Sequence, residues 1–357
     1  MALTKIADLW TPAIWIPATR EKLATFPSIL NSGAVVKGPQ FDAIAAGGGI
    51  TANMPMWKDI TDQDDEVQVE DTAPVTTNKI TSGTMICVPT NRVWKGGATA
   101  LAGQLAGDSD PVDEMTAQLA MARDKRRQKR IIATLRGAFG ATGAANAACA
   151  LSAVRLGGTT AEPFDETGND ATDDQKFSPD MFIDAQALMG ELENDLAGGL
   201  ILCHSNIKAR LKKLDKDNFK TGKPSDLPFT ITTYRDVPII VSDSLVRAGS
   251  GNGYVYDTYI LGRGTIAWGA KPQVGGELNN PIKDVASLNM WVDGDKNSEY
   301  MADRTREVIH INGLAWGGTP ADPNNGPTNA ELYTAGNWSL IYQTANRVGI
   351  TCIRTNG

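Results

Sequence analysis

The most extended pattern of hydrophobic and polar positions is a helical period over residues 110–136. Asp110 is a residue type that favours the N-cap, and Pro111 fits the first helical position. Gly137 and Gly140 are expected to end the helix. At 1.5 Å per residue such a helix would be about 39 Å long. The pattern therefore predicts one helix longer than is usual in a globular domain.

A second helical period covers residues 178–196, where apolar residues recur at every third or fourth position. Ser178 is expected to cap this helix, and the pair of glycines at 198–199 is expected to end it. A short buried strand is predicted over 200–203. Ser205 is expected to cap the helix that follows, whose lysines would face outward.

Other apolar runs have the period of strands. Those at 66–70 and 79–88 alternate with polar residues, and a turn containing Pro74 would join them into a long hairpin. Further strands are predicted over 237–241, 254–261, 265–268 and 306–316. Helices that pack on sheets whose strands come from distant segments indicate the α+β class. The first 47 residues are interrupted by prolines and are expected to form an extended arm.

Composition narrows the classes of function. The 357 residues include 34 Lys or Arg and 41 Asp or Glu, for a net charge of −7. Such a balance disfavours a dedicated nucleic-acid-binding protein, because binding through phosphates needs a basic surface, and it leaves this role only to a local patch. The sequence has no apolar run long enough to span a membrane, and no secretory signal is expected at its start. Its four cysteines lack CxxC spacing and are expected to be reduced.

The residues that enzymes use are scarce. His204 and His310 are the two histidines, and Cys203 precedes His204 on a predicted strand, where neighbouring side chains face opposite ways. The GxSxG, HExxH and Walker motifs are absent. Asp293 and the acidic residue two positions later resemble the start of a calcium loop, but Arg304 stands where its glutamate belongs. No catalytic, cofactor-binding or metal-binding residue is expected.

Two clusters of charge remain as candidate sites. The long helix carries six cations within eight residues, and these could form a solvated face or contact an acidic neighbour or packaged DNA. These cations are Arg123, Lys125, Arg126, Arg127, Lys129 and Arg130. The predicted hairpin carries an exposed tryptophan and a run of acids, which could be an ordinary loop tip or an intersubunit contact. These residues are Trp57, Asp59, Asp62, Asp64, Asp65, Glu66, Glu70 and Asp71.

Several short motifs along nearly the whole chain resemble one family. They are Leu3-Thr-Lys-Ile-Ala-Asp8, Ala45-Ala-Gly-Gly-Gly49 with Asn53-Met-Pro55 and Trp57, Ile131 to Gly137, Tyr259-Ile-Leu-Gly262 with Gly264, and Pro327-Thr-Asn-Ala-Glu-Leu332 with Asn337-Trp338. On these residues the chain resembles the tailed-phage major capsid proteins of the HK97 fold, in particular the Gp13-like group. The acidic segment at 156–175 and the dense basic cluster are stronger here than the resemblance leads us to expect.

The resemblance implies an HK97-like fold whose parts can be assigned to residue ranges. They are an N-arm at 1–47, an E-loop hairpin at 48–95, a P-domain spine helix with a connecting insert at 96–177, an A-domain at 178–297, and returning P-domain strands with the C-terminal segment at 298–357. The implied function is self-assembly into hexamers and pentamers of an icosahedral phage head around double-stranded DNA. A portal, a separate scaffolding protein and assembly in the cytoplasm of a bacterial host are implied as well.

Two other functions stay open at this point. An encapsulin-like nanocompartment shell shares the fold but encloses enzymes, and a soluble α+β enzyme would need chemistry that the sequence does not offer. The arm and hairpin carry apolar residues such as Trp10, Trp15 and Trp57, which a lone subunit could not bury well. We therefore expect an assembled form rather than a stable monomer.

Overall fold

The computed structural model of the chain describes residues 29–47, 49, 51–60, 78–99, 111–140, 154–156, 173–196, 198–222, 231–249, 253–270, 288–295, 297–323 and 325–357. The expected arm up to residue 28, the predicted strand at 66–70, the helix cap at Asp110 and residues 157–172 of the acidic segment lie outside these ranges.

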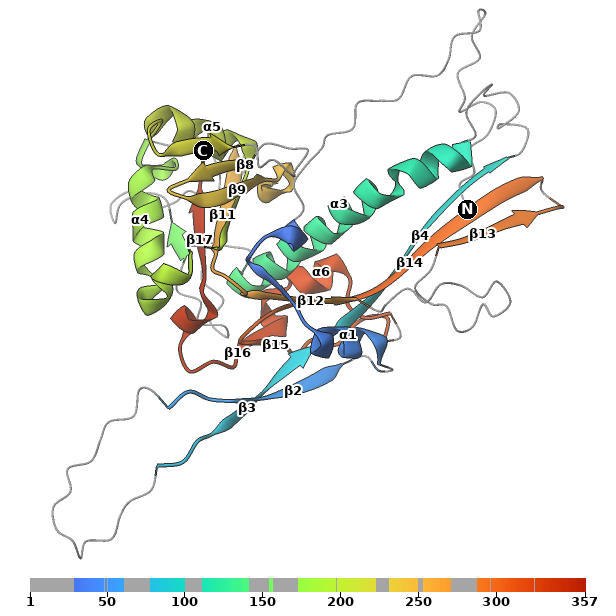
Figure 1. The fold of residues 1–357 in the computed structure, drawn as a ribbon, viewed down its shortest axis with the longest axis horizontal. Helices are drawn as coiled ribbons and strands as arrows, with labels where there is room; N and C mark the ends of the chain where they lie inside the picture. Colours follow the sequence, from blue (N-terminus) through green and yellow to red (C-terminus); the bar gives the residue numbers. More distant parts are fainter. Residues whose placement is uncertain are drawn as a thin grey trace, which may run out of the picture.

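The long predicted helix is α3 (Pro111–Phe139), which runs beside a sheet of long strands (Figure 1). Within the described residues this sheet has the order β1 (Val35–Lys37), β12 (Ile266–Ala270), β14 (Ser298–Ile311) and β13 (Leu288–Asp293), and β4 (Pro89–Thr99) also pairs with β14. The pairing of β4 with β14 extends from Thr99 opposite Ser298 to Pro89 opposite Val308. This antiparallel ribbon contacts α3 from Met115 to Arg130.

A second sheet is formed mainly by later parts of the chain. Its order is β5 (Val154–Leu156), β17 (Ile350–Thr355), β11 (Tyr254–Leu261), β6 (Leu200–Cys203), β9 (Val237–Val241), β8 (Ile231–Tyr234) and β7 (Phe219–Gly222), with β10 (Val246–Ala248) paired to β11. One face packs on α4 (Pro179–Ala187) and α5 (Ser205–Leu214), through residues such as Ile201 and Phe182. The other face packs on the buried half of α3, through residues such as Leu202 and Leu135. The sheet is therefore a middle layer between helices.

A buried ion pair ties the end of α3 to the second sheet. Asp257 and Arg354 are register partners on β11 and β17, each 1% exposed, with Nε of Arg354 2.8 Å from the carboxylate. Arg136 of α3 binds the second carboxylate oxygen at 3.2 Å, and Arg354 also donates to the carbonyl of Gly140 at 2.9 Å. The end of α3 is thereby held in a fixed position relative to β11 and β17.

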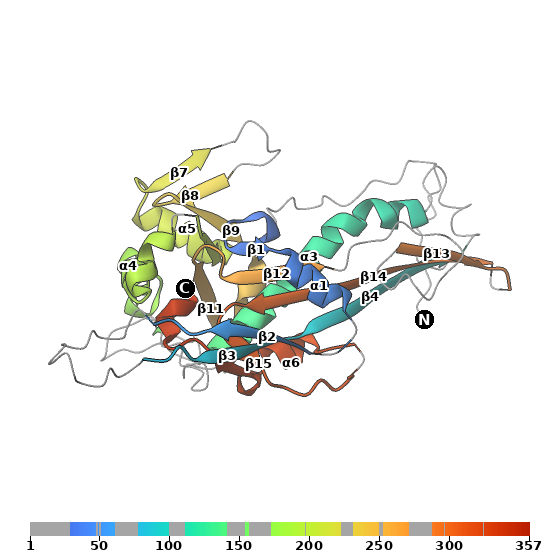
Figure 2. The same ribbon diagram turned by 60° about the horizontal axis from the view of Figure 1, so that its bottom comes forward.

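In the described residues, the hairpin is paired differently from what the sequence predicts. β3 (Ser82–Cys87) confirms a strand within 79–88, but its partner is β2 (Ala52–Trp57), which pairs with it over six residues. Figure 2 shows this ribbon below the first sheet, near β15 (Leu314–Trp316), which pairs with β16 (Trp338–Leu340). The alternation around residue 67 therefore does not identify the partner of β3.

Three helix boundaries also differ from the prediction. α4 ends at Ala187 and a 3-10 turn (Gly190–Leu196) follows, because Gly190 adopts a φ of +59° that interrupts the helix. His204, not Ser205, caps α5, since its Nδ1 accepts from the backbone N–H of Asn206. α3 continues through Gly137, where a Cβ would collide with the carbonyl oxygen of Leu332 in α6 (Asn329–Tyr333).

Other elements differ from the expected ranges because the pairing of strands depends on residues that are distant in the sequence. The segment expected to be an extended arm ends in α1 (Pro39–Ala46), with its proline at the first helical position. The run at 306–316 is divided into β14 and β15 by Gly313, whose φ is +89°. β17, from the range 298–357, lies in the second sheet, whereas β12 and β13, from 178–297, lie in the first. Sheet membership therefore divides the chain differently from the expected ranges.

His310 lies on β14 in the core, beside Trp338 of the C-terminal segment. It is 1% exposed, its Nε2 donates to the carbonyl of Leu314 at 2.8 Å, and its ring lies 5.9 Å from that of Trp338. Burial lowers the pKa of His310 to about 4, although the hydrogen bond to Leu314 opposes this. The native imidazole is therefore neutral over the range in which an exposed histidine takes up a proton.

We predict that protein stability depends on pH through His310. This group takes up a proton near pH 6.5 in the unfolded chain and near pH 4 in the native chain. The contribution of the neutral imidazole to the free energy of unfolding is therefore complete above pH 6.5 and is lost as the pH falls to 4. The loss would amount to about 3 kcal/mol, at 1.36 kcal/mol per pKa unit. Denaturant unfolding of the wild type and of His310→Gln measures the difference. Equal slopes of unfolding free energy against pH in the two proteins would contradict the prediction.

Candidate functional site

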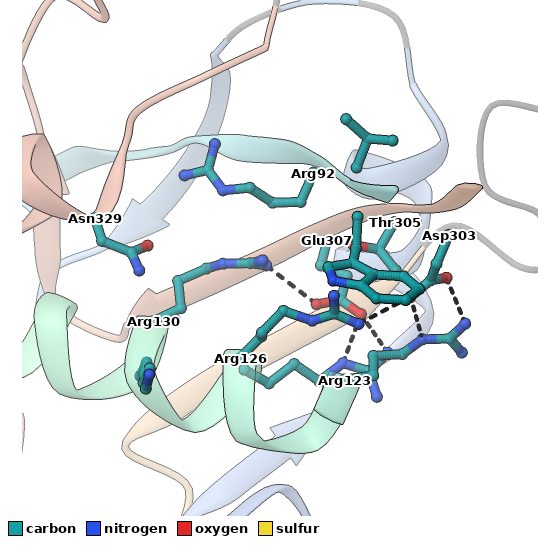
Figure 3. A pocket seen from close by; sticks show the side chains of 12 residues that line it. Arg92, Arg123, Arg126, Arg130, Asp303, Thr305, Glu307 and Asn329 are labelled. Carbon is teal, nitrogen blue, oxygen red and sulfur yellow. Dashed lines mark hydrogen bonds and ion pairs between the residues drawn. The ribbon is translucent and has the colours of Figure 1, made fainter. Parts of the chain in front are cut away.

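A pocket of about 180 Å³ lies between α3, β4 and β14, at the predicted basic cluster. Arginines dominate its walls, together with two carboxylates, and Figure 3 shows α3 below and β4 above the opening. The lining residues are Arg92, Val93, Trp94, Arg123, Arg126, Arg127, Lys129, Arg130, Asp303, Thr305, Glu307 and Asn329.

Four of the six predicted cations form ion pairs with β14. Arg123 binds Asp303 at 2.6 Å and Arg126 binds its other oxygen at 3.2 Å. Arg127 pairs with Glu307 through a short contact, and Arg130 reaches the second oxygen of Glu307 at 3.1 Å. Both carboxylates are 2% exposed. These four arginines therefore do not form a solvated face, which was one of the two expectations.

The spacing of the two elements explains why these groups meet. Asp303 and Glu307 are four residues apart on a strand, so their side chains share one face at a separation of about 13 Å. The arginines from Arg123 to Arg130 occupy one face of a helix at intervals of three and four residues, over about 10 Å. The two rows have similar lengths, so each carboxylate meets a pair of arginines.

Electrostatics in the pocket depends on burial. Burial lowers the pKa of Arg130 to about 10, and the charges of Arg92 and Arg127 add to this effect while Glu307 opposes it. Burial is also the largest single effect on Arg127, but the hydrogen bonds and charges of Glu307 and Asp124 together outweigh it and raise the pKa of this arginine. At neutral pH all of these guanidinium groups remain charged, so the two acids hold them in place by charged hydrogen bonds.

The two lysines of the predicted cluster differ from its arginines. Lys129 is exposed and lines the pocket, whereas Lys125 is half-buried and does not line it. Gln128 lies between them, 3% exposed, and its amide has no hydrogen-bond partner within the described part of the chain. The six cations lie on one helix, but the sequence does not predict their separate positions.

The predicted hairpin residues are described only in part. Trp57 ends β2 and is 70% exposed, so a large apolar surface faces solvent in the single subunit. Asp59 forms an ion pair with Arg347, and its carbonyl accepts from Nε2 of Gln343 at 3.0 Å. The other predicted residues, Asp62, Asp64, Asp65, Glu66, Glu70 and Asp71, lie outside the described residues. An intersubunit role for all eight stays a prediction.

Arg306, which the sequence analysis did not identify, organises the base of this hairpin. Its Nε donates to the carbonyl of Ala45 at 2.8 Å, and its Nη2 donates to the carbonyls of Gly47 at 2.7 Å and Gly49 at 2.9 Å. Its Nη1 reaches the side chain of Asn91 at 3.3 Å. One guanidinium from β14 thus binds the end of α1 and the turn that leads into β2.

The sequence contains a pattern that predicts the buried acids and a weaker pattern that predicts a role for Arg306. Asp303, Thr305 and Glu307 alternate with Arg304 and Arg306, so a strand there must bury one charged row. A buried acidic row requires cations, and the basic cluster on α3 supplies them. Arg306 belongs to the opposite row, but its carbonyl partners come from a distant segment.

Two of the residues considered for catalysis, His204 and Cys203, are part of the folded framework of the protein. His204 caps α5 and lies 3.7 Å from Asp243, and burial lowers its pKa while that acid opposes the shift. Cys203 is buried, and burial raises the pKa of its thiol to about 12. Within the described ranges, groups of three or more possible metal ligands are absent. The described helices also include none that is long and apolar enough to cross a membrane.

Comparison with known proteins gives consistent results. The model of a family described as phage capsid protein matches residues 92–296. The major capsid protein of Bacillus phage SPP1 is 27% identical over 348 residues, which is 96% of this chain and 95% of that protein. Among solved structures, the capsid of Ralstonia phage GP4 has a TM-score of 0.62 at 9% identity and covers 99% of this chain and 98% of its own. The capsid asymmetric unit of Cyanophage Pam1 has a TM-score of 0.57 at 10% identity, with 96% of each chain covered. The fold is therefore the HK97 type, as the resemblance implied.

We predict that Glu307→Gln destabilises the chain by about 3–5 kcal/mol, because Arg130 would keep a buried charge without its partner. Denaturant unfolding measures the change, with Glu191→Gln as the matched control, since Glu191 is exposed on a 3-10 turn. An effect no larger than that of the control would show that the buried pairs contribute little.

We predict that Arg306→Ala loosens the base of the hairpin without unfolding either sheet. Loss of a charged donor to three carbonyls should speed amide exchange in 52–57 about ten-fold, the scale of one charged hydrogen bond. Arg263→Ala is the control, because Arg263 is exposed and outside this contact. Unchanged exchange at 52–57 would show that the β2–β3 ladder alone fixes the hairpin.

Proposed function

Because this chain belongs to the phage capsid protein family, we propose that it builds an icosahedral phage head as hexamers and pentamers around double-stranded DNA. It is a major capsid protein that forms capsid shells and is part of the virion. The match of the family model to 92–296 carries this conclusion, together with the HK97-type fold over nearly the entire chain.

The shape of the subunit supports assembly from many copies. The β2–β3 ribbon has two strands, and such a ribbon is marginally stable alone in water. Its tryptophan at position 57 and the residues Met290 and Val292 of β13 are exposed in the single subunit. Head-to-tail contacts form a closed ring when the rotation from one copy to the next divides a full turn evenly. Such contacts would cover these exposed surfaces. These features fit a shell subunit better than a free monomer.

We assign the β2–β3 ribbon and residues 48–95 to the E-loop, and α3 with β4 and β14 to the P-domain. Under this assignment the acidic run from Asp59 to Asp71 lies across a neighbouring subunit and meets cations there. The second sheet with α4 and α5 forms the A-domain around the axis of each capsomer. We further propose contacts with a portal and with a separate scaffolding protein during assembly in the cytoplasm of a bacterial host.

The two alternative functions are weaker. A nanocompartment shell is not favoured, because the family model and the similar proteins are phage capsid proteins. An enzyme would need a reactive group, but His310 is buried with a lowered pKa and His204 serves as a helix cap. Electron microscopy of the purified chain tests the shell directly, since a strictly monomeric species across salt and pH would contradict it.

We predict that deletion of 62–74, bridged by a Gly-containing turn, removes shells but spares folding of the subunit. The deleted segment would act mainly between copies, and β2 and β3 keep their pairing on either side of it. Shell yield by electron microscopy and melting of the subunit measure the two effects.

A second variant distinguishes the effect of the length of the hairpin on shell formation from the effect of its negative charge. It keeps the full hairpin but replaces the six acids between Asp62 and Asp71 with Asn or Gln. Loss of shells in both variants indicates charge-dependent contacts, and loss in the deletion alone indicates contacts of the backbone or apolar residues. Collapse of the subunit after deletion would show that the segment is core structure and that its assignment to the E-loop is wrong.

A further inference from the structure

The pocket between α3, β4 and β14 contains more positive charge than its carboxylates neutralise. Six cations line it, whereas Asp303 and Glu307 are the two lining carboxylates. Asp124 lies near Arg127, and Glu331 acts on Arg92 from outside the lining. Even with these two acids counted, an excess of two positive charges remains around the opening.

Two of the cations line the pocket from opposite walls without an ion pair to a carboxylate in the described part of the chain. Arg92 comes from β4, and its guanidinium is held by the backbone carbonyl oxygens of Pro327 and Asn91. Lys129 comes from α3 and is exposed. Among the residues that the structure describes, neither forms an ion pair. Figure 3 shows Arg92 across the opening from the arginines of α3.

The remaining arginines are already fixed in position. Asp303 and Glu307 are each held by two arginines, so a ligand would not need to order these side chains on binding. Arg130 is 5% exposed, and its lowered pKa is partly due to the charges of Arg92 and Arg127. An anion in the pocket would offset this repulsion.

We propose that this pocket binds a phosphate group, with Arg92 and Lys129 as its main ligands and Arg126 at the rim. A phosphate group is tetrahedral and accepts hydrogen bonds from several directions, which suits cations on opposite walls, whereas a planar carboxylate accepts mainly in one plane. The cavity of about 180 Å³ holds one phosphate group, so a DNA duplex could place a single backbone phosphate there. This role is separate from shell building, which the proposed function already covers.

Titration of the purified full-length chain with inorganic phosphate tests the proposal. Calorimetry at constant ionic strength, with chloride as the balancing anion, separates binding from screening. Lys129→Gln should weaken phosphate binding at least three-fold and the pair Arg92→Gln with Lys129→Gln at least ten-fold. Lys213→Gln, an exposed lysine on α5, is the matched control and should change nothing. Thermal melting without phosphate checks that Lys129→Gln is folded.

Competition with a DNA duplex distinguishes the DNA backbone from free phosphate as the source of the bound phosphate group. Displacement of inorganic phosphate by the duplex, with the same dependence on Lys129, identifies the DNA backbone as the source. Phosphate binding that the duplex does not affect identifies free phosphate instead. Absence of phosphate binding, an equal loss in Lys213→Gln, or binding only of a peptide with the sequence of 59–71 would overturn the proposal. Electron microscopy measures shell formation separately, so failure of the proposed shell function can be distinguished from failure of phosphate binding.

Discussion

The position of α3 depends on two buried carboxylates that hold four arginines against one strand. Asp303 and Glu307 sit on β14, and each binds a pair of guanidinium groups from the helix. Removing two carboxylates from water is costly, and the structure offsets that cost with several charged hydrogen bonds to each. β14 also pairs with β4, β12 and β13, so the helix is fixed to the strand that organises the first sheet.

The same strand supports the other functional parts of the molecule. Arg306, in the row opposite Asp303 and Glu307, binds the turn that leads into the projecting hairpin. At its far end α3 meets the second sheet through Arg136 and Asp257. One helix and one strand thus connect the hairpin base, the arginine pocket and the second sheet. A shell subunit needs such a connection, because contacts at one edge must be supported by the rest of the molecule.

The local elements could largely be predicted from the sequence, because period and capping are local. The sequence predicted α3, the start of α4 and the strands at 200–203, 237–241 and 254–261. It extended the helix after Ser178 too far, although Gly190 offered a break. It could not assign β17 to the second sheet or β2 as the partner of β3, because pairing depends on contacts between distant segments. The resemblance supplied the fold type, which these patterns alone did not.

The candidate site was predictable in composition but not in geometry. Six cations within eight residues mark the cluster, yet nothing local tells that four of them turn inward to β14 and that Lys129 stays exposed. That division depends on the rotation of α3 about its axis, which the buried residues Ile131 and Leu135 and the ion pairs to β14 set together.

Buried ion pairs, and not apolar packing alone, fix α3 on β14. A double-mutant cycle of Arg130→Met and Glu307→Gln, followed by denaturant unfolding, measures the coupling between the two residues directly. We expect a coupling energy of about 2 kcal/mol or more, with the double variant more stable than the sum of the two single losses. A coupling energy near zero would contradict it and would assign the position of the helix to apolar contacts.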